Sequence, residues 1–194
     1  GRAWPGDFGN SRLAVCAGGG EPSNSDSTEE WSWTGTLAAG SWATGNDINT
    51  TRSTQGGAGI QTAAVIFGGY GGPPGLNETE EYDGTSWSEQ NNLNTARQYF
   101  RAGYGLQTAA VAVSGSIGST LNTAVENYDG TSWTAGTAVN TALKFGSGGG
   151  TQTAGLAFGG GTPSTQNGET ESFDGSSWTE LNDLNAGRLN VKSG

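Results

Sequence analysis

Histidine and methionine are missing from this chain of 194 residues, and cysteine occurs only once. Without histidine, the chain cannot build Cys/His zinc sites, histidine-ligated haem, or Ser-His-Asp and Cys-His catalytic groups. A single thiol, Cys16, cannot form an internal disulfide, so no cystine framework holds the chain together. Cys16 lies in an apolar run, and we expect it to behave as a small buried hydrophobic residue.

Charge is also scarce, and it is mostly of one sign. Charged residues make up 13% of the chain, and eight Lys and Arg against 18 Asp and Glu give a net charge of −10. There is no basic run that could displace counterions from a phosphate backbone, so we expect no nucleic acid partner. No stretch approaches about 18 apolar residues, which predicts that no segment inserts into a membrane.

Glycine, by contrast, is abundant, with 36 residues, and such a composition is compatible with disorder unless the aromatic residues are placed regularly. Four of the seven tryptophans recur at intervals of 45, 46 and 45 residues, and an aromatic residue precedes each of the last three by five positions. Gln-Thr-Ala followed by an apolar run recurs with the same period, starting at Gln61, Gln107 and Gln152. This register indicates an internal repeat.

The period divides the chain into four repeats. We expect a longer, divergent first repeat over residues 1–51, and further repeats over 52–96, 97–142 and 143–187. Residues 188–194 would start a fifth repeat or form a closing strand. Because the chain starts and stops inside connectors and lacks an initiator methionine, we expect it to be a fragment of a longer array.

Each repeat predicts four short strands and almost no helix. The apolar runs are too short for a helix and are bounded by glycine, which indicates buried strands. The Asp-Gly after Tyr82 predicts a hairpin turn, because that turn needs a positive φ, and a short strand then carries Trp87. The stretch after the connector, residues 98–104, predicts another strand that turns back at 106–108.

A period of about 45 residues with four antiparallel strands is typical of a β-propeller blade. Gly-Gly after an apolar strand, then a tyrosine and a tryptophan a few residues on, resembles the kelch repeat across essentially the whole chain. The resemblance implies an all-β fold, a kelch-like β-propeller of four-stranded antiparallel blades. A linear β-solenoid is the alternative fold. Four blades could close alone, or two chains could complete a ring of eight.

Residues that recur with the period are expected to serve the scaffold, with the tryptophans filling the gaps between blades. The glutamates two residues before each aromatic, Glu80, Glu126 and Glu171, could pair with a column of arginines in which Leu143 replaces one member. The expected structural columns are Trp42, Trp87, Trp133, Trp178, Tyr82, Tyr128, Phe173, Gly68, Gly69, Gly159 and Gly160.

Function is expected where the repeats differ, in the segments 21–28, 70–76, 116–121 and 161–166. In kelch-like propellers such loops lie on one face together with the connectors, so the resemblance implies a scaffold that presents variable loops to a partner. The candidate partner-binding residues are Glu21, Asp26, Tyr70, Pro73, Leu76, Ile117, Leu121 and Gln166.

No catalytic residue, cofactor or metal site is expected, since no carboxylate motif or spaced acidic calcium loop stands out. The wording of the repeat, GxQTAxxxFGG, then YDGTSWT and LNTAR, is similar to kelch-like arrays in virion and tail-associated proteins of marine bacteriophages. This implies a non-catalytic structural or binding module of a phage-like virion, such as a tail fibre, appendage or decoration protein. It would be located on the virion, outside cells.

The expected partners are a host surface glycan or protein, or other virion proteins, and the chain could also form a homo-oligomer. Two alternatives are a kelch-type protein interaction adaptor outside a virion and a non-catalytic part of a carbohydrate-active enzyme.

Overall fold

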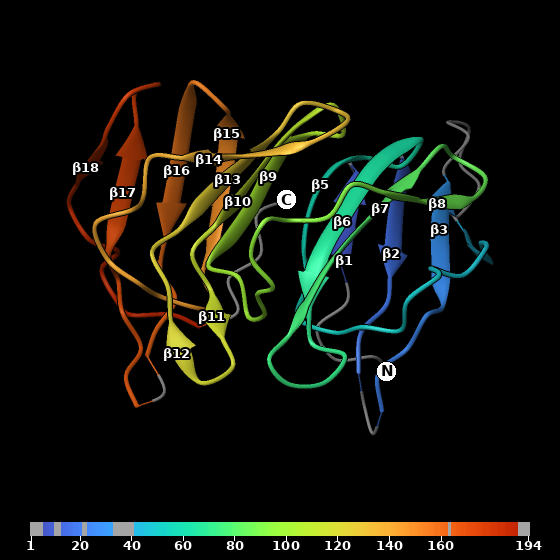
Figure 1. The fold of residues 1–194 in the computed structure, drawn as a ribbon, viewed down its shortest axis with the longest axis horizontal. Coiled ribbons are helices and arrows are strands. Elements are labelled where there is room, and N and C mark those ends of the chain that lie inside the picture. Colours follow the sequence, from blue (N-terminus) through green and yellow to red (C-terminus); the bar gives the residue numbers. More distant parts are fainter. Residues whose placement is uncertain (1–5, 10–12, 21–22, 33–40, 163, 190–194) are drawn as a thin grey trace.

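The computed structural model describes residues 6–9, 13–20, 23–32, 41–162 and 164–189. In these residues the chain is all-β, without a helix, and it forms four antiparallel sheets of four strands each (Figure 1). In every sheet the strands pair in chain order, so each sheet is built from one continuous stretch of sequence.

The strands of the first two sheets are β1 (Gly6–Gly9), β2 (Leu13–Ala17), β3 (Thr28–Ser32), β4 (Ser41–Thr44), β5 (Gly56–Ile60), β6 (Ala63–Gly69), β7 (Leu76–Tyr82) and β8 (Trp87–Gln90). Those of the third and fourth sheets are β9 (Ala102–Leu106), β10 (Ala109–Val113), β13 (Val125–Tyr128), β14 (Trp133–Gly136), β15 (Ser147–Thr151), β16 (Ala154–Phe158), β17 (Thr170–Phe173) and β18 (Trp178–Glu180). A small separate hairpin, β11 (Ser116–Ile117) and β12 (Thr120–Leu121), follows β10.

The Asp-Gly turns join the third and fourth strands of the last three sheets. In the second sheet, Asp83 Oδ1 accepts hydrogen bonds from the backbone N–H groups of Thr85 and Ser86, each at 2.8 Å. These bonds to the charged form lower the pKa of Asp83. The turn brings Tyr82 opposite Trp87, with ring centroids 4.9 Å apart, and the third and fourth sheets repeat the arrangement.

The hydrophobic cores lie between neighbouring sheets. One cluster joins Val15 and Ala17 of β2 to Ile66 of β6, and a second joins Phe67 of β6 to Ala112 of β10. A third joins the third and fourth sheets in the same way. The sheets therefore bury their apolar side chains against their immediate neighbours, as in repeat proteins that are stabilised by contacts between neighbours.

The first strands of the sheets lie next to one another in succession: β1 against β5, β5 against β9, and β9 against β15. These strands are rich in glycine because the approach is close. A Cβ added to Gly103 would lie 2.6 Å from the backbone nitrogen of Gly57, closer than real contacts allow. The row of first strands holds the four sheets side by side along one line of contact.

The strand expected over residues 98–104 is wrong at both ends. The observed strand, β9, begins at Ala102, because Gln98 pairs with Ser116 and Tyr99 has a φ of 54°, which interrupts an extended chain.

Cys16 also differs from expectation, since it is only half-buried. Its neighbours Val15 and Ala17 point into the core, so alternation along β2 turns Cys16 to the other face.

Candidate binding face

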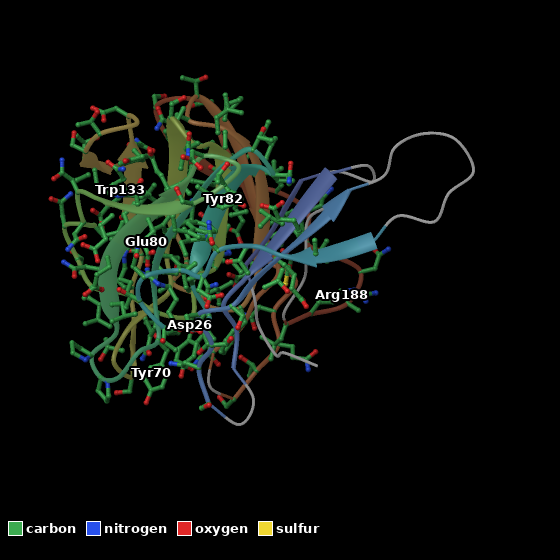
Figure 2. All side chains as sticks on the ribbon, turned by 90° about the vertical axis from the view of Figure 1, so that its right-hand side faces the viewer. Asp26, Tyr70, Glu80, Tyr82, Trp133 and Arg188 are labelled. Atoms are coloured by element: carbon green, nitrogen blue, oxygen red, sulfur yellow. The ribbon has the colours of Figure 1, made fainter. Side chains whose placement is uncertain are left out.

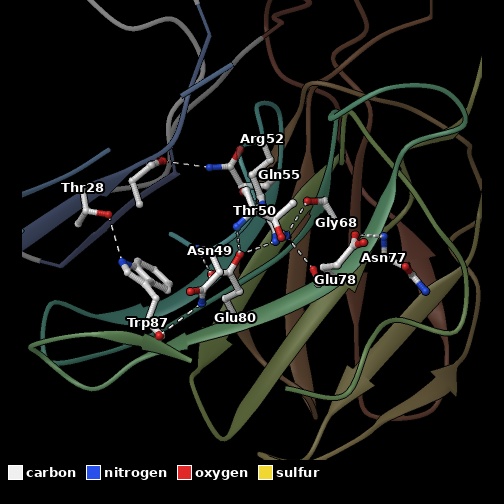
Figure 3. Close-up of polar contacts among 11 residues, drawn as sticks. Thr28, Asn49, Thr50, Arg52, Gln55, Gly68, Asn77, Glu78, Glu80 and Trp87 are labelled. Atoms are coloured by element: carbon white, nitrogen blue, oxygen red, sulfur yellow. Dashed lines mark hydrogen bonds and ion pairs between the residues drawn. The ribbon is translucent and has the colours of Figure 1, made fainter. Parts of the chain in front are cut away.

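A buried ion pair anchors the connector that enters the second sheet (Figure 3). Arg52 Nη2 donates to Glu80 Oε1 at 2.6 Å, and both side chains are fully buried. The other carboxylate oxygen of Glu80 accepts the backbone N–H of Asn49 at 2.6 Å and its side-chain amide at 3.0 Å. Burial lowers the pKa of Arg52, and the neighbouring Glu80 opposes that shift.

The third sheet repeats this clamp. Arg97 Nη2 lies 2.8 Å from Glu126 Oε1, and Asn94 donates both its backbone and its side-chain N–H to Glu126 Oε2. Nη1 of Arg97 donates to the backbone carbonyls of Ser114 and Ala124. Each connector is thus held against the third strand of the sheet it enters.

In the fourth sheet the same glutamate takes its arginine from elsewhere. Leu143 occupies the arginine position and is fully buried, while Glu171 Oε1 accepts from Arg101 Nη1 at 2.5 Å. Arg101 lies just before β9, so this ion pair crosses from the third sheet to the fourth. The sequence analysis did not predict this ion pair. The leucine at position 143 of the arginine column and the additional arginine at position 101 could have indicated it.

Tryptophan and glutamine side chains also connect neighbouring sheets. Trp87 Nε1 donates to Thr28 Oγ1 of the first sheet at 3.1 Å, and Trp133 Nε1 donates to Thr79 Oγ1 of the second at 2.9 Å. Trp178, which meets a valine at the equivalent threonine position, donates to the carbonyl of Thr137 instead. The side chain of Trp42 lies outside the described residues.

The glutamines of the Gln-Thr-Ala turns connect neighbouring sheets, which the sequence did not reveal. Gln107 Nε2 donates to the carbonyls of Ala64 and Tyr82 in the preceding sheet, at 3.1 and 2.9 Å. Gln152 makes the equivalent two bonds to the third sheet. The repetition of Gln marked these positions, but its partners are distant in sequence, so only the structure identifies them.

The variable loops gather at one end of the sheets, which we call the loop end. Here the connectors pair with the loops that follow the second strands: Ser53 with Tyr70, Gln98 with Ser116, and Lys144 with Gly161. Figure 2 shows Asp26 and Tyr70 toward this end of the molecule, whereas Trp133 and Tyr82 lie toward the opposite end.

The predicted binding residues differ in accessibility. Asp26, Pro73 and Gln166 are exposed, whereas Tyr70, Leu76, Ile117 and Leu121 are half-buried. Glu21 lies outside the described residues. The glycines predicted as columns serve the packing, since Gly69 N–H donates to the carbonyl of Arg97 and Gly160 N–H donates to that of Arg188.

The loops of different repeats contact one another. The side chain of Asn24 donates to the carbonyl of Tyr70 at 2.5 Å, and the backbone N–H of Gly118 donates to the carbonyl of Pro74 at 2.8 Å. The first three loops therefore form one continuous surface, which neighbouring repeats build together.

An aromatic cluster at the loop end was only partly anticipated. Tyr70 stacks on Tyr99 with ring centroids 6.3 Å apart, and Tyr99 contacts Phe145 at 4.8 Å. Lys144 Nζ lies 4.9 Å from the centroid of Tyr99 and 5.2 Å from that of Phe145. Tyr70 was a predicted binding residue, but the other three were not among the predicted binding residues.

Other kinds of site find no support in the part of the chain that the structure describes. There, no three His, Cys, Asp or Glu side chains gather in a way that could hold a metal ion, and no helix could span a membrane. Comparison of the chain with models of protein families found no match, and neither did comparison with curated proteins.

Proposed function

We propose that the chain is a non-catalytic binding module of a phage-like virion, and that its loop end recognises a host surface glycan or another virion protein. The observation that carries this proposal is that recurring residues make the packing contacts, whereas the variable residues lie in loops at one end. The recurring Arg, Glu, Asn and Trp are committed to packing. The variable loops are tied together at one end, where Asp26, Pro73 and Gln166 are exposed.

The proposed architecture is a kelch-like β-propeller in which each four-stranded sheet is a blade. Three features support it: one sheet per repeat, a row of first strands, and cores formed between consecutive sheets. Class averages from electron microscopy, viewed along the direction of the first strands, test this architecture. Radially arranged blades are expected, and a straight stack of sheets would indicate a solenoid.

Placement on an extracellular particle is supported by the resemblance of the repeat sequence. It is also supported by the low fraction of charged residues and the negative net charge, which favour solubility and weaken adhesion to nucleic acid. The binding proposal is tested with a glycan array and with immobilised tail proteins of a marine bacteriophage. Loss of binding is expected for Asp26→Ala or Gln166→Ala, which change the loop end. Glu180→Ala, at an exposed position of β18, is the matched control. Binding to neither class of partner by the intact protein would refute the proposal.

A further inference from the structure

Three connector positions at the loop end share an unusual backbone. Thr54, Tyr99 and Phe145 have φ values of 56°, 54° and 59°, a left-handed conformation that favours glycine. Among the other described residues with a positive φ, all are glycine except Ser114, as at Gly69 and Gly160. At these corners the chain instead holds a β-branched residue and two aromatic rings, in a backbone conformation that is strained for residues other than glycine.

At two of these corners the strained backbone holds the rings of an aromatic cluster. Tyr99 and Phe145 are half-buried, so part of each ring reaches solvent beside Tyr70 and Lys144. Packing alone does not require rings here, because the equivalent corner at Thr54 forms with a small side chain. An outlier of this kind points to a role for the side chain itself.

Lys144 gives the cluster a charge that is rare in this protein. Of the eight basic residues, the described arginines 52, 97 and 101 are buried against glutamates. Lys144 and Arg188 are the other basic residues in the described part of the chain. An ammonium over two rings keeps N–H donors available for an anionic group, and a charge-assisted hydrogen bond is the stronger kind.

We propose that Tyr70, Tyr99, Phe145 and Lys144 form a binding site for an acidic saccharide. The C–H face of a sugar ring would lie against the electron-rich aromatic faces, and its carboxylate or phosphate would bond to Lys144. This inference rests on the proposed function, because it assigns a ligand class to the same loop end.

The experiment measures binding of the intact protein to paired oligosaccharides by calorimetry. A galacturonic acid trimer is compared with the neutral galactose trimer, and a phosphorylated hexose distinguishes phosphate from carboxylate. The acidic sugar is expected to bind more tightly than its neutral counterpart, and added salt is expected to weaken that preference.

Tyr99→Gly removes a ring while suiting the positive φ of the backbone, so the variant should fold. We expect its affinity for the acidic sugar to fall about tenfold, in line with a lost aromatic contact. Lys144→Gln should lower the affinity about tenfold and remove the preference for acidic over neutral sugar. Thr54→Gly changes an equivalent corner that has no ring and should bind like the unmodified protein.

Different failures have different meanings. Unchanged affinity in Tyr99→Gly, or equal binding of acidic and neutral sugars, would overturn the acidic-saccharide site. If another glycan or a virion protein still bound through Asp26 or Gln166, the proposed function would stand without this site. Binding to no partner at all would overturn both.

Discussion

The second and fourth sheets hold the same buried glutamate with arginines from different places. Glu80 is paired with Arg52, 28 residues earlier on the connector that enters the same sheet. Glu171 is paired with Arg101, 70 residues earlier at the start of β9 in the neighbouring sheet. Both carboxylates are fully buried, so each requires a positive partner, but the sequence position of that partner is free.

The structure shows what permits the exchange. Arg101 can cross to the fourth sheet because Gly146 leaves room: a Cβ there would lie 3.0 Å from Arg101 Cγ and 2.9 Å from a carbonyl oxygen. Leu143, freed from pairing, fills the arginine position with apolar volume. The comparison shows that each repeat requires a positive charge beside its buried glutamate, but that the arginine supplying this charge can come from different positions in the sequence. The exchange also adds a buried ion pair between the third and fourth sheets.

The largest effect is expected from Arg101→Ala. It leaves Glu171 buried without its partner, which costs about 3–5 kcal/mol of unfolding free energy. Because contacts in repeat proteins run between neighbours, the loss should be local. Hydrogen exchange should show lower protection in β16 and β17 than in β6 and β7. Equal loss of protection in all four sheets would contradict the local role assigned to this pair.

The second prediction is a rescue. Adding Leu143→Arg to Arg101→Ala restores the arrangement of the second and third sheets and should recover about 1–3 kcal/mol, the usual range for coupled residues. Leu143→Arg alone should destabilise the protein, since two guanidinium groups would then compete for Glu171. Urea unfolding of the two single variants and the double variant gives the coupling energy. An additive result would show that the positions are not equivalent.

A smaller effect is expected from Gln107→Ala. It leaves the carbonyls of Ala64 and Tyr82 without the amide that bridges them, which costs about 1–2 kcal/mol. Gln61→Ala is the matched comparison, because Gln61 donates to the Glu30 side chain through a longer bond of 3.3 Å. Its urea midpoint should shift less than that of Gln107→Ala, and a reversed order would contradict the bridging role.

Arg188 belongs to the same column as Arg52 and Arg97, but it is exposed (Figure 2). In this chain Arg188→Ala should change the unfolding free energy by less than about 0.5 kcal/mol, as usual for surface sites. In a chain extended by another repeat, the same substitution should cost as much as Arg97→Ala. Thermal denaturation of the substituted and unsubstituted forms of both chains measures this. It shows whether the effect of Arg188 depends on its position in the arginine column or on burial in an ion pair.

The smallest effect concerns the exposed turns. Backbone N–H groups of Ser177 and Ser176 lower the pKa of Asp174 from its ordinary 3.8 to about 2. A folded pKa below the unfolded one means that this stabilisation is present above pH 4 and is lost as the pH falls toward 2. Asp174→Asn should reduce the fall in thermal midpoint over that range. An unchanged acid profile would show that the turn bonds contribute nothing.

The sequence predicted the repeat and the all-β class because both depend on local patterns. Alternation, short apolar runs and Asp-Gly turns act within a few residues, and they place most strands of the second to fourth sheets. The arginine and glutamate columns also indicated repeated ion pairs, and the structure shows which residues pair: Arg52 with Glu80 and Arg97 with Glu126. The loop residues were recognised by their variation, and their proposed role in binding stays a prediction.

The tertiary structure alone determined the contacts between repeats. The partner of Glu171, the carbonyls bridged by Gln107, and the approach of Tyr70, Lys144 and Phe145 to Tyr99 all join residues of different repeats. A periodic sequence states what recurs within one unit, but the packing of one unit on the next determines which side chains meet. A buried charge or a ring then interacts with whatever lies nearest in space, regardless of its distance along the chain.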